Sequence, residues 1–166
     1  MLKDIISRID GITFYLIAFS ILAYSLGVPL SLLAVSAHSA WYTHITYCFA
    51  HGNAMHLLVN CYMLSLFAVN GYHDFNRIAV IGFLTACVAS LACVGATPTI
   101  GLSGVIFAIY GLLVARYPCK RDLIVSAICL AVGFIPPMNG LLHVVCWSMG
   151  FAEGRLFKYI KIWIRK

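Results

Sequence analysis

The stretch IGLSGVIFAIYG, from Ile100 to Gly111, decides how the chain folds. It opens with one serine between Gly101 and Gly104, and the apolar run that follows continues to Ala115. At about 1.5 Å per residue, a helix of this length is too short to cross a hydrocarbon core of about 30 Å. In a membrane such a helix must begin within the bilayer, which is tolerated only where protein or a water-filled cavity surrounds the preceding loop.

The rest of the chain has the composition of a membrane protein. Of its 166 residues, 63% are apolar and 10% are charged, whereas soluble domains average about half apolar and a quarter charged. Six apolar runs are separated by short connections. They lie at about 11–28, 56–70, 78–96, 102–115, 123–135 and 141–157. The pattern predicts an all-α membrane protein with six transmembrane helices, which form a single domain over residues 1–166.

The basic residues divide the connections into two sets. All eleven Lys and Arg residues precede the first run, lie at or after the end of the sixth, or lie between runs two and three or four and five. The other connections, 29–50, 97–101 and 136–140, have none. Because cytoplasmic connections collect Lys and Arg, both termini are expected in the cytoplasm, in a multi-pass protein of the cell (plasma) membrane. The net charge of +6 then reflects topology, and nucleic-acid binding is not expected.

Neither a cleaved leader nor a metal site is expected. The first apolar run is longer than the h-region of a signal peptide, and five further runs follow it. The seven cysteines include no C-x-x-C pair, so they indicate neither a disulfide framework nor a zinc site. His51 and His56 are about 140° apart on a helix, unlike the i, i+4 zinc pair of metalloproteases. No metal or cofactor is therefore predicted.

Polar side chains that are costly inside a membrane occur at the start of three of these helices. The second run opens with HGNAMHLLVN, which holds His51, His56 and Asn60; the fourth opens with Ser103, and the sixth contains His143. Helices two, four and six all start from the side that lacks basic residues. These side chains are therefore expected at one depth.

Together these side chains suit acyl transfer. His143 is a candidate general base for the Ser103 hydroxyl, and no Asp or Glu is expected on that side to form a third member. Backbone N–H groups at the start of the helix of Ser103 are unpaired and point toward incoming negative charge. His56 and Asn60 share a helix face, where both side chains can donate to a developing oxyanion.

Each residue alone also has a simpler interpretation. Ser103 is a preferred helix N-cap, His143 could be a packing histidine bonded to a carbonyl, and Asn60 could join two helices. Phe107, one turn after the serine, is either core filler or a ring that packs on the imidazole of His143. The combination of these residues at one depth favours a catalytic site.

In combination these residues resemble the rhomboid intramembrane serine proteases. The motifs that carry the resemblance are H-x4-H-x3-N, G-x-S-G, and a histidine in the sixth helix with a glycine seven residues after it. In this sequence they are His51, His56 and Asn60; Gly101, Leu102, Ser103 and Gly104; and His143 and Gly150. The G-x-S-G motif is not the G-x-S-x-G elbow of soluble hydrolases.

The resemblance implies a six-helix rhomboid-like bundle, with an open lateral side near the fifth helix and a half-submerged first loop. It implies a catalytic dyad of Ser103 and His143. It also implies an oxyanion site made by His56, Asn60 and the Ser103 amide, and a mainly structural role for His51. The activity implied is that of a serine endopeptidase that cleaves transmembrane proteins near the outer boundary of the membrane.

Small residues on the fourth and sixth helices are spaced for close helix packing. They are Gly104, Ala108 and Gly111 on the fourth, and Cys146, Gly150 and Gly154 on the sixth. Close approach of these helices would bring the serine to the histidine. Leu142 and Cys146 depart from the small residues that relatives often have around the histidine, which could widen the dyad or shift the sixth helix.

The sequence therefore predicts an intramembrane serine endopeptidase whose partners are transmembrane protein substrates and the lipid bilayer. The oligomeric state stays open. One alternative is a catalytically silent rhomboid-like scaffold that binds transmembrane clients, although such a binder would need neither Ser103 nor His143. Another is a transporter or channel, but the chain has no inverted repeat and no acidic residue is expected within its spans.

Overall fold

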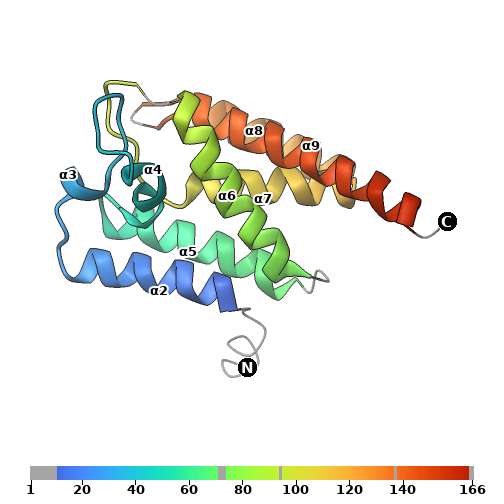
Figure 1. Cartoon of the computed structure of the whole chain (residues 1–166), viewed down its shortest axis with the longest axis horizontal. Helices are drawn as coiled ribbons and strands as arrows, with labels where there is room; N and C mark the ends of the chain where they lie inside the picture. Colours follow the sequence, from blue (N-terminus) through green and yellow to red (C-terminus); the bar gives the residue numbers. More distant parts are fainter. Residues whose placement is uncertain (1–10, 71–73, 94, 137, 165–166) are drawn as a thin grey trace.

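The computed structural model describes residues 11–70, 74–93, 95–136 and 138–164, with side chains to residue 158 (Figure 1). Its long elements are all helices, which confirms the predicted all-α class. These helices are α2 (Gly11–Ser25), α5 (Ala54–Val69), α6 (Phe75–Cys93), α7 (Ser103–Arg116), α8 (Lys120–Val132) and α9 (Gly140–Ile164). The connection from α2 to α5 holds three short helices. They are α3 (Leu30–Leu33), α4 (Thr43–Thr46) and η1 (Tyr47–Phe49).

The helices differ in their ability to cross a membrane alone. Among the described residues, α6 is the one helix that is long and apolar enough by itself. The segment Thr43–Phe49 and α5 pass the same test only as a pair, with a bend of 94° between them. The apolar helices α2 and α7 are shorter. For α7 this matches the short run that begins at the serine.

A glycine ends α2 before the end of its apolar run. Gly27 has a φ of 62°, which costs little only for glycine. Its N–H donates to the carbonyl of Tyr24 at 3.1 Å, and the N–H of Val28 donates to that of Ala23 at 3.1 Å. These two hydrogen bonds form a Schellman motif, so the chain turns away into the first loop after Ser25.

α7 is the central helix, and α9 packs directly on it. Ten of the 14 residues of α7 are buried. A Cβ added at Gly150 of α9 would meet the carbonyl of Ala108, and one added at Gly111 of α7 would meet the carbonyl of Trp147. The two backbones are therefore in contact at these glycines. The contact fixes the positions at which α7 and α9 begin relative to each other.

α8 is held more loosely than the other long helices. Ser126 is the one buried residue among its 13 residues. The Ser126 hydroxyl accepts a hydrogen bond from Trp147 Nε1 at 3.2 Å, and Tyr110 Oη donates to the carbonyl of Asp122 at 3.0 Å. Most of α8 therefore remains exposed at the side of the bundle.

Hydrogen bonds join three connections at the end of the bundle where α3 and α4 lie (Figure 1). Val35 and Thr99 form an isolated antiparallel bridge, with N–H to O distances of 3.1 and 2.8 Å. The N–H of Gly101 donates to the carbonyl of Tyr47 at 2.8 Å, and Asn139 Nδ2 donates to Thr99 Oγ1 at 2.9 Å. The first loop thus bonds to the segment that precedes α7, and that segment bonds to the one that precedes α9.

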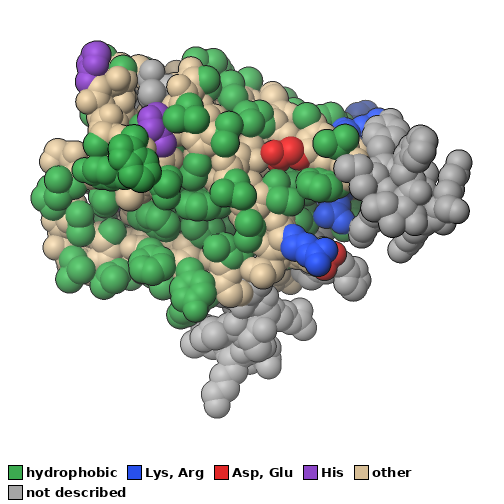
Figure 2. All heavy atoms as spheres, viewed as in Figure 1, with side chains coloured by type: hydrophobic (Ala, Val, Ile, Leu, Met, Phe, Trp, Pro, Cys, Tyr) green, Lys and Arg blue, Asp and Glu red, His purple; other side chains and the backbone are tan. Residues whose placement is uncertain are grey.

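Charge is concentrated at the opposite end of the bundle. In Figure 2 the Lys and Arg side chains gather away from the loops, and the face between is largely apolar. Four basic residues at or near this end are Arg77, Arg116, Lys120 and Arg155. Lys3, Arg8, Arg165 and Lys166 lie outside the described residues, as does the side chain of Lys161.

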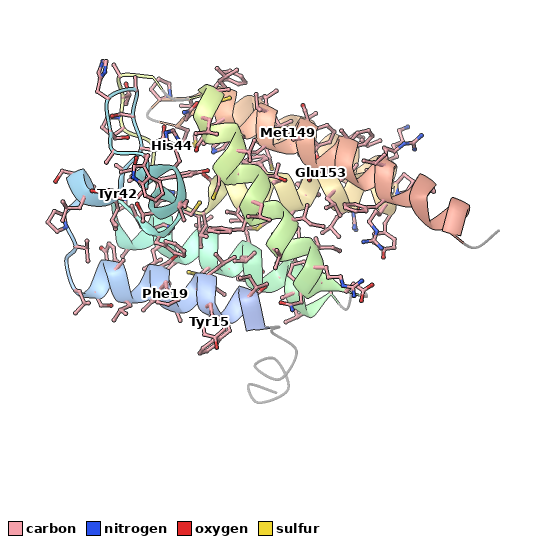
Figure 3. The ribbon with its side chains drawn as sticks, viewed as in Figure 1. Tyr15, Phe19, Tyr42, His44, Met149 and Glu153 are labelled. Carbon is pink, nitrogen blue, oxygen red and sulfur yellow. The ribbon has the colours of Figure 1, made fainter. Side chains whose placement is uncertain are left out.

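Glu153 differs from the expectation that acidic residues lie outside the spans. It lies within α9, beside α6 (Figure 3), and its position already falls inside the sixth apolar run, 141–157. Thr85 Oγ1 of α6 is 2.8 and 2.9 Å from the two carboxylate oxygens. This hydrogen bond gives the carboxylate a polar partner between two apolar helices.

Candidate active site

The side chains of Ser103 and His143 are hydrogen-bonded, with His143 Nε2 2.9 Å from Ser103 Oγ. Ser103 is the first residue of α7, and its helix has no side-chain cap, since the N-cap position is Leu102. His143 lies in the first turns of α9. Asn139 caps that helix, because its Oδ1 accepts from the N–H of Leu142 at 3.1 Å. Two helix starts thus bring a hydroxyl and an imidazole together.

The imidazole of His143 is packed on one face. The ring of Phe107, one turn into α7, stacks on it with a centroid distance of 4.5 Å and an angle of 24° between planes. His143 is only 5% exposed, whereas Ser103 is half-buried. The histidine is therefore fixed in orientation while the hydroxyl remains reachable.

His51 and Asn60 form a buried pair beside this site. Asn60 Nδ2 is 3.1 Å from His51 Nε2, and His51 Nδ1 is 3.2 Å from the carbonyl oxygen of Phe49. Since a carbonyl only accepts, Nδ1 carries the hydrogen and Nε2 accepts from Asn60. This bond fixes the Asn60 amide group and leaves its second N–H for another acceptor.

Gly101 adjoins the side chains of His56 and Asn60. Its φ is 105°, and a Cβ at this position would be 2.7 Å from His56 Nε2 and 3.2 Å from Asn60 Nδ2. Both nitrogens therefore lie on one side of the glycine, two residues before Ser103. His56 is itself positioned by Asn53, whose Oδ1 accepts from the His56 N–H at 2.8 Å and caps α5. The arrangement places the side-chain nitrogens of His56 and Asn60 beside the segment that leads to the serine.

Comparison with known protein families identifies the family of the chain. The family model for the Rhomboid domain matches residues 38–160. The chain belongs to the rhomboid family. The match confirms the resemblance found in the sequence, and it extends from the first loop into α9. Comparison with curated proteins gives no match.

Membership fixes the coarse properties of the protein. Rhomboid proteins are integral membrane proteins, and the family consists generally of intramembrane serine proteases. The chain is thus an α-helical membrane bundle of this family. Among the described residues, no group of three or more His, Cys, Asp or Glu side chains could hold a metal ion.

The two departures from the rhomboid pattern are accommodated without separating the dyad. Leu142 and Cys146 are 1% and 0% exposed. The Cys146 sulfur lies opposite Gly104, 3.5 Å from the position a Cβ would take there. Ser103 and His143 remain within hydrogen-bond distance with both residues in place.

Three residues of the site were not found in the sequence. Asn139 had a readable signal, since an asparagine directly before a helix is a preferred N-cap. Tyr47, which bonds to Gly101 through its carbonyl, and Gly133, which lies against His143, had none. Tyr47 acts across a long stretch of chain, Gly133 acts across the turn between α8 and α9, and only the folded structure brings them to the site.

Proposed function

We propose that this rhomboid protein is an intramembrane serine endopeptidase in which Ser103 is the nucleophile and His143 the general base. The observation that carries the proposal is the hydrogen bond of 2.9 Å between Ser103 Oγ and His143 Nε2. A hydroxyl bonded to an imidazole is the arrangement that activates serine for attack. The stacked ring of Phe107 supports it by holding the imidazole plane.

The reaction follows from these positions. Ser103 Oγ attacks the carbonyl carbon of the scissile peptide bond while its proton passes to His143 Nε2. The imidazolium then gives this proton to the leaving amine, which departs as the acyl-enzyme forms. A water molecule, deprotonated by the same imidazole, attacks the ester, and the proton returns to Ser103 as the acid product leaves.

The negative oxygen of the tetrahedral intermediates needs donors that are already in place. The free N–H of Asn60, the imidazole of His56 and the backbone N–H of Ser103 supply them. Gly101 keeps the space between these donors open. In comparable sites, removing one such donor costs about 3 kcal/mol of transition-state stabilisation. His51 is a positioning residue in this scheme, because it acts through its bond to Asn60.

We propose further that the substrates are transmembrane proteins, which enter sideways from the lipid between α5 and α8. The loose packing of α8 supports this path, since Ser126 alone is buried on it. Peptide bonds of a substrate helix are hidden in i to i−4 hydrogen bonds. Glycine or proline near the cleavage site eases local unwinding and should therefore favour cleavage.

The proposed topology has six crossings and cytoplasmic termini, with the dyad near the outer boundary of the cell membrane. The separation of charge supports it, since Arg77, Arg116 and Lys120 lie at helix ends remote from the dyad. Cytoplasmic segments of membrane proteins are enriched in such residues. Cleavage is then expected near the outer end of a substrate span.

The experiment compares the wild type with Ser103→Ala and His143→Ala in proteoliposomes. Each is incubated with a fluorescent fluorophosphonate and, separately, with a single-span model protein that carries glycine and proline near its outer end. Ser25→Ala, an exposed serine at the end of α2, is the matched control. The wild type and the control should be labelled by the probe and should cleave the model protein. Both active-site variants should be labelled and should cleave far more slowly than the wild type.

Two outcomes would reject the proposal. Full cleavage by Ser103→Ala would remove the serine from the chemistry. Binding of the model protein by a wild type that neither labels nor cleaves would instead support the catalytically silent scaffold.

A further inference from the structure

His143 has a polar atom that the proposed mechanism leaves without a partner. When Nε2 accepts from the serine, the ring hydrogen must be on Nδ1. Within the described part of the chain, Nδ1 of His143 is a buried side-chain nitrogen with no hydrogen-bond partner in the protein. A buried donor without an acceptor is costly, so it is rarely left unsatisfied. In Ser-His-Asp proteases a carboxylate fills this role.

The C-terminal end of α8 lies against this nitrogen. Gly133 is the C-cap residue of α8. A Cβ added there would be 2.8 Å from His143 Nδ1, 3.1 Å from the carbonyl oxygen of Leu130 and 3.5 Å from that of Cys129. The nitrogen and the two carbonyl oxygens therefore surround one side of Gly133. The carbonyl end of α8 therefore lies beside the ring nitrogen at this glycine.

The chemistry of a helix end suits this position. The last carbonyl groups of a helix have no partner within it, and together they carry about half a negative charge. The N–H of Gly133 bonds to the carbonyl of Cys129 at 3.0 Å, and that of Phe134 bonds to Ala131 at 3.2 Å. Neither of these two N–H groups donates to the Leu130 carbonyl. It can accept from a new donor.

We propose that the carbonyl end of α8 is the third member of the catalytic site, and that Gly133 is a positioning residue that allows His143 to reach it. The partial negative charge of this helix end attracts the Nδ1 hydrogen, favours the tautomer in which Nε2 faces Ser103, and stabilises the imidazolium that forms during attack. Glycine is required because any side chain at 133 would fill the contact. This inference rests on the proposed protease function.

The test measures how fast Ser103 reacts with the fluorescent fluorophosphonate in proteoliposomes. In this step Ser103 Oγ bonds to phosphorus, fluoride leaves, and His143 takes the hydroxyl proton. Gly133→Ala is compared with Gly95→Ala, which places the same methyl where nothing lies within 4 Å. Because a misplacement of about 1 Å can cost roughly 100-fold, the limiting rate of Gly133→Ala should fall about 10- to 100-fold. The half-saturating probe concentration should stay within about twofold, and Gly95→Ala should match the wild type.

A second measurement does not depend on activity. In protein labelled with ¹⁵N-histidine, the His143 signals are assigned by their loss in His143→Gln. The wild type should carry hydrogen on Nδ1 of this ring, and Gly133→Ala should shift it toward the Nε2–H tautomer. A substitution that only loosened the fold would not move the His143 ring hydrogen from Nδ1 to Nε2.

The outcomes separate this inference from the function on which it rests. An unchanged limiting rate in Gly133→Ala would overturn it, as would a slow rate with an unchanged tautomer. If Gly133→Ala fails to fold, an Nε2–H tautomer in the wild type would overturn it and an Nδ1–H tautomer would support it. If the wild type neither labels nor cleaves, the protease proposal fails, and the tautomer measurement still decides the position of the Nδ1 hydrogen.

Discussion

Replacing Gly150 with alanine tests whether the contact between α7 and α9 sets the spacing of the dyad. The added Cβ would meet the carbonyl group of Ala108, at 2.8 Å from the carbonyl carbon, where ordinary contact begins at 3.4 Å. The obstacle is backbone and cannot rotate away. At the level of Gly150, α7 and α9 must therefore move apart by at least 0.6 Å, which is the difference between 3.4 and 2.8 Å.

Such a separation matters because Ser103 and His143 begin the same two helices. Gly150 is about 10 Å from His143 along α9 at 1.5 Å per residue. If the helices move apart as rigid bodies, the distance of 2.9 Å between Oγ and Nε2 approaches the limit of a hydrogen bond. Displacements of this size cost up to about 100-fold in rate. Overpacking should also cost about 1–3 kcal/mol of stability.

The assay is cleavage of the single-span model protein in proteoliposomes, with thermal unfolding followed in detergent. We expect Gly150→Ala to lose about 10- to 100-fold in kcat with a lowered unfolding temperature. Gly11→Ala is the matched control, because it is also in a helix and has nothing within 4 Å of the added methyl. Wild-type kcat in Gly150→Ala would refute the reasoning that the backbone contact sets the dyad distance.

Three further substitutions, measured by the same cleavage assay, address the neighbours of the dyad. Gly101→Ala places a methyl 2.7 Å from His56 Nε2 at a φ of 105° and should cost about 100- to 1000-fold in kcat; retention of more than a tenth of the rate would argue against an oxyanion site there. His51→Ala frees the Asn60 amide group and should lower kcat about tenfold, which is a smaller loss than that expected for Asn60→Ala. A larger loss in His51→Ala than in Asn60→Ala would contradict a positioning role for His51. Phe107→Leu removes a stacking contact worth about 0.5–1.5 kcal/mol, so the rate should fall about 3- to 10-fold, while Phe107→Tyr should stay near the wild type.

The overall fold could be predicted because each membrane helix has a local signal in the sequence. An apolar run of known length predicts a helix directly, and the short run after Ser103 correctly indicated a helix that begins at that residue. The bend of 94° before α5 and the short helices of the first loop could not be predicted. They depend on bonds between distant segments, such as that between Val35 and Thr99.

The candidate site was predicted in part for the same reason. Its polar residues are unusual in an apolar chain, so composition alone marked His56, Ser103 and His143. Distances between helices cannot be predicted from any local pattern in the sequence. Gly133 was one glycine among 13, and only the approach of α8 to α9 gives it a role. Glu153 is the opposite case, because its position inside the sixth apolar run could be read from the sequence, and the expectation of no acidic residue within the runs was wrong.

The Val35–Thr99 bridge has a consequence for engineering. Together with the bonds from Gly101 to Tyr47 and from Asn139 to Thr99, it joins three stretches of chain into one hydrogen-bonded unit next to Ser103. A chimera that imports only the first loop from another rhomboid would break bonds on which the G-x-S-G segment depends. Grafts should therefore exchange all three stretches at once, so that the bonds between them are kept.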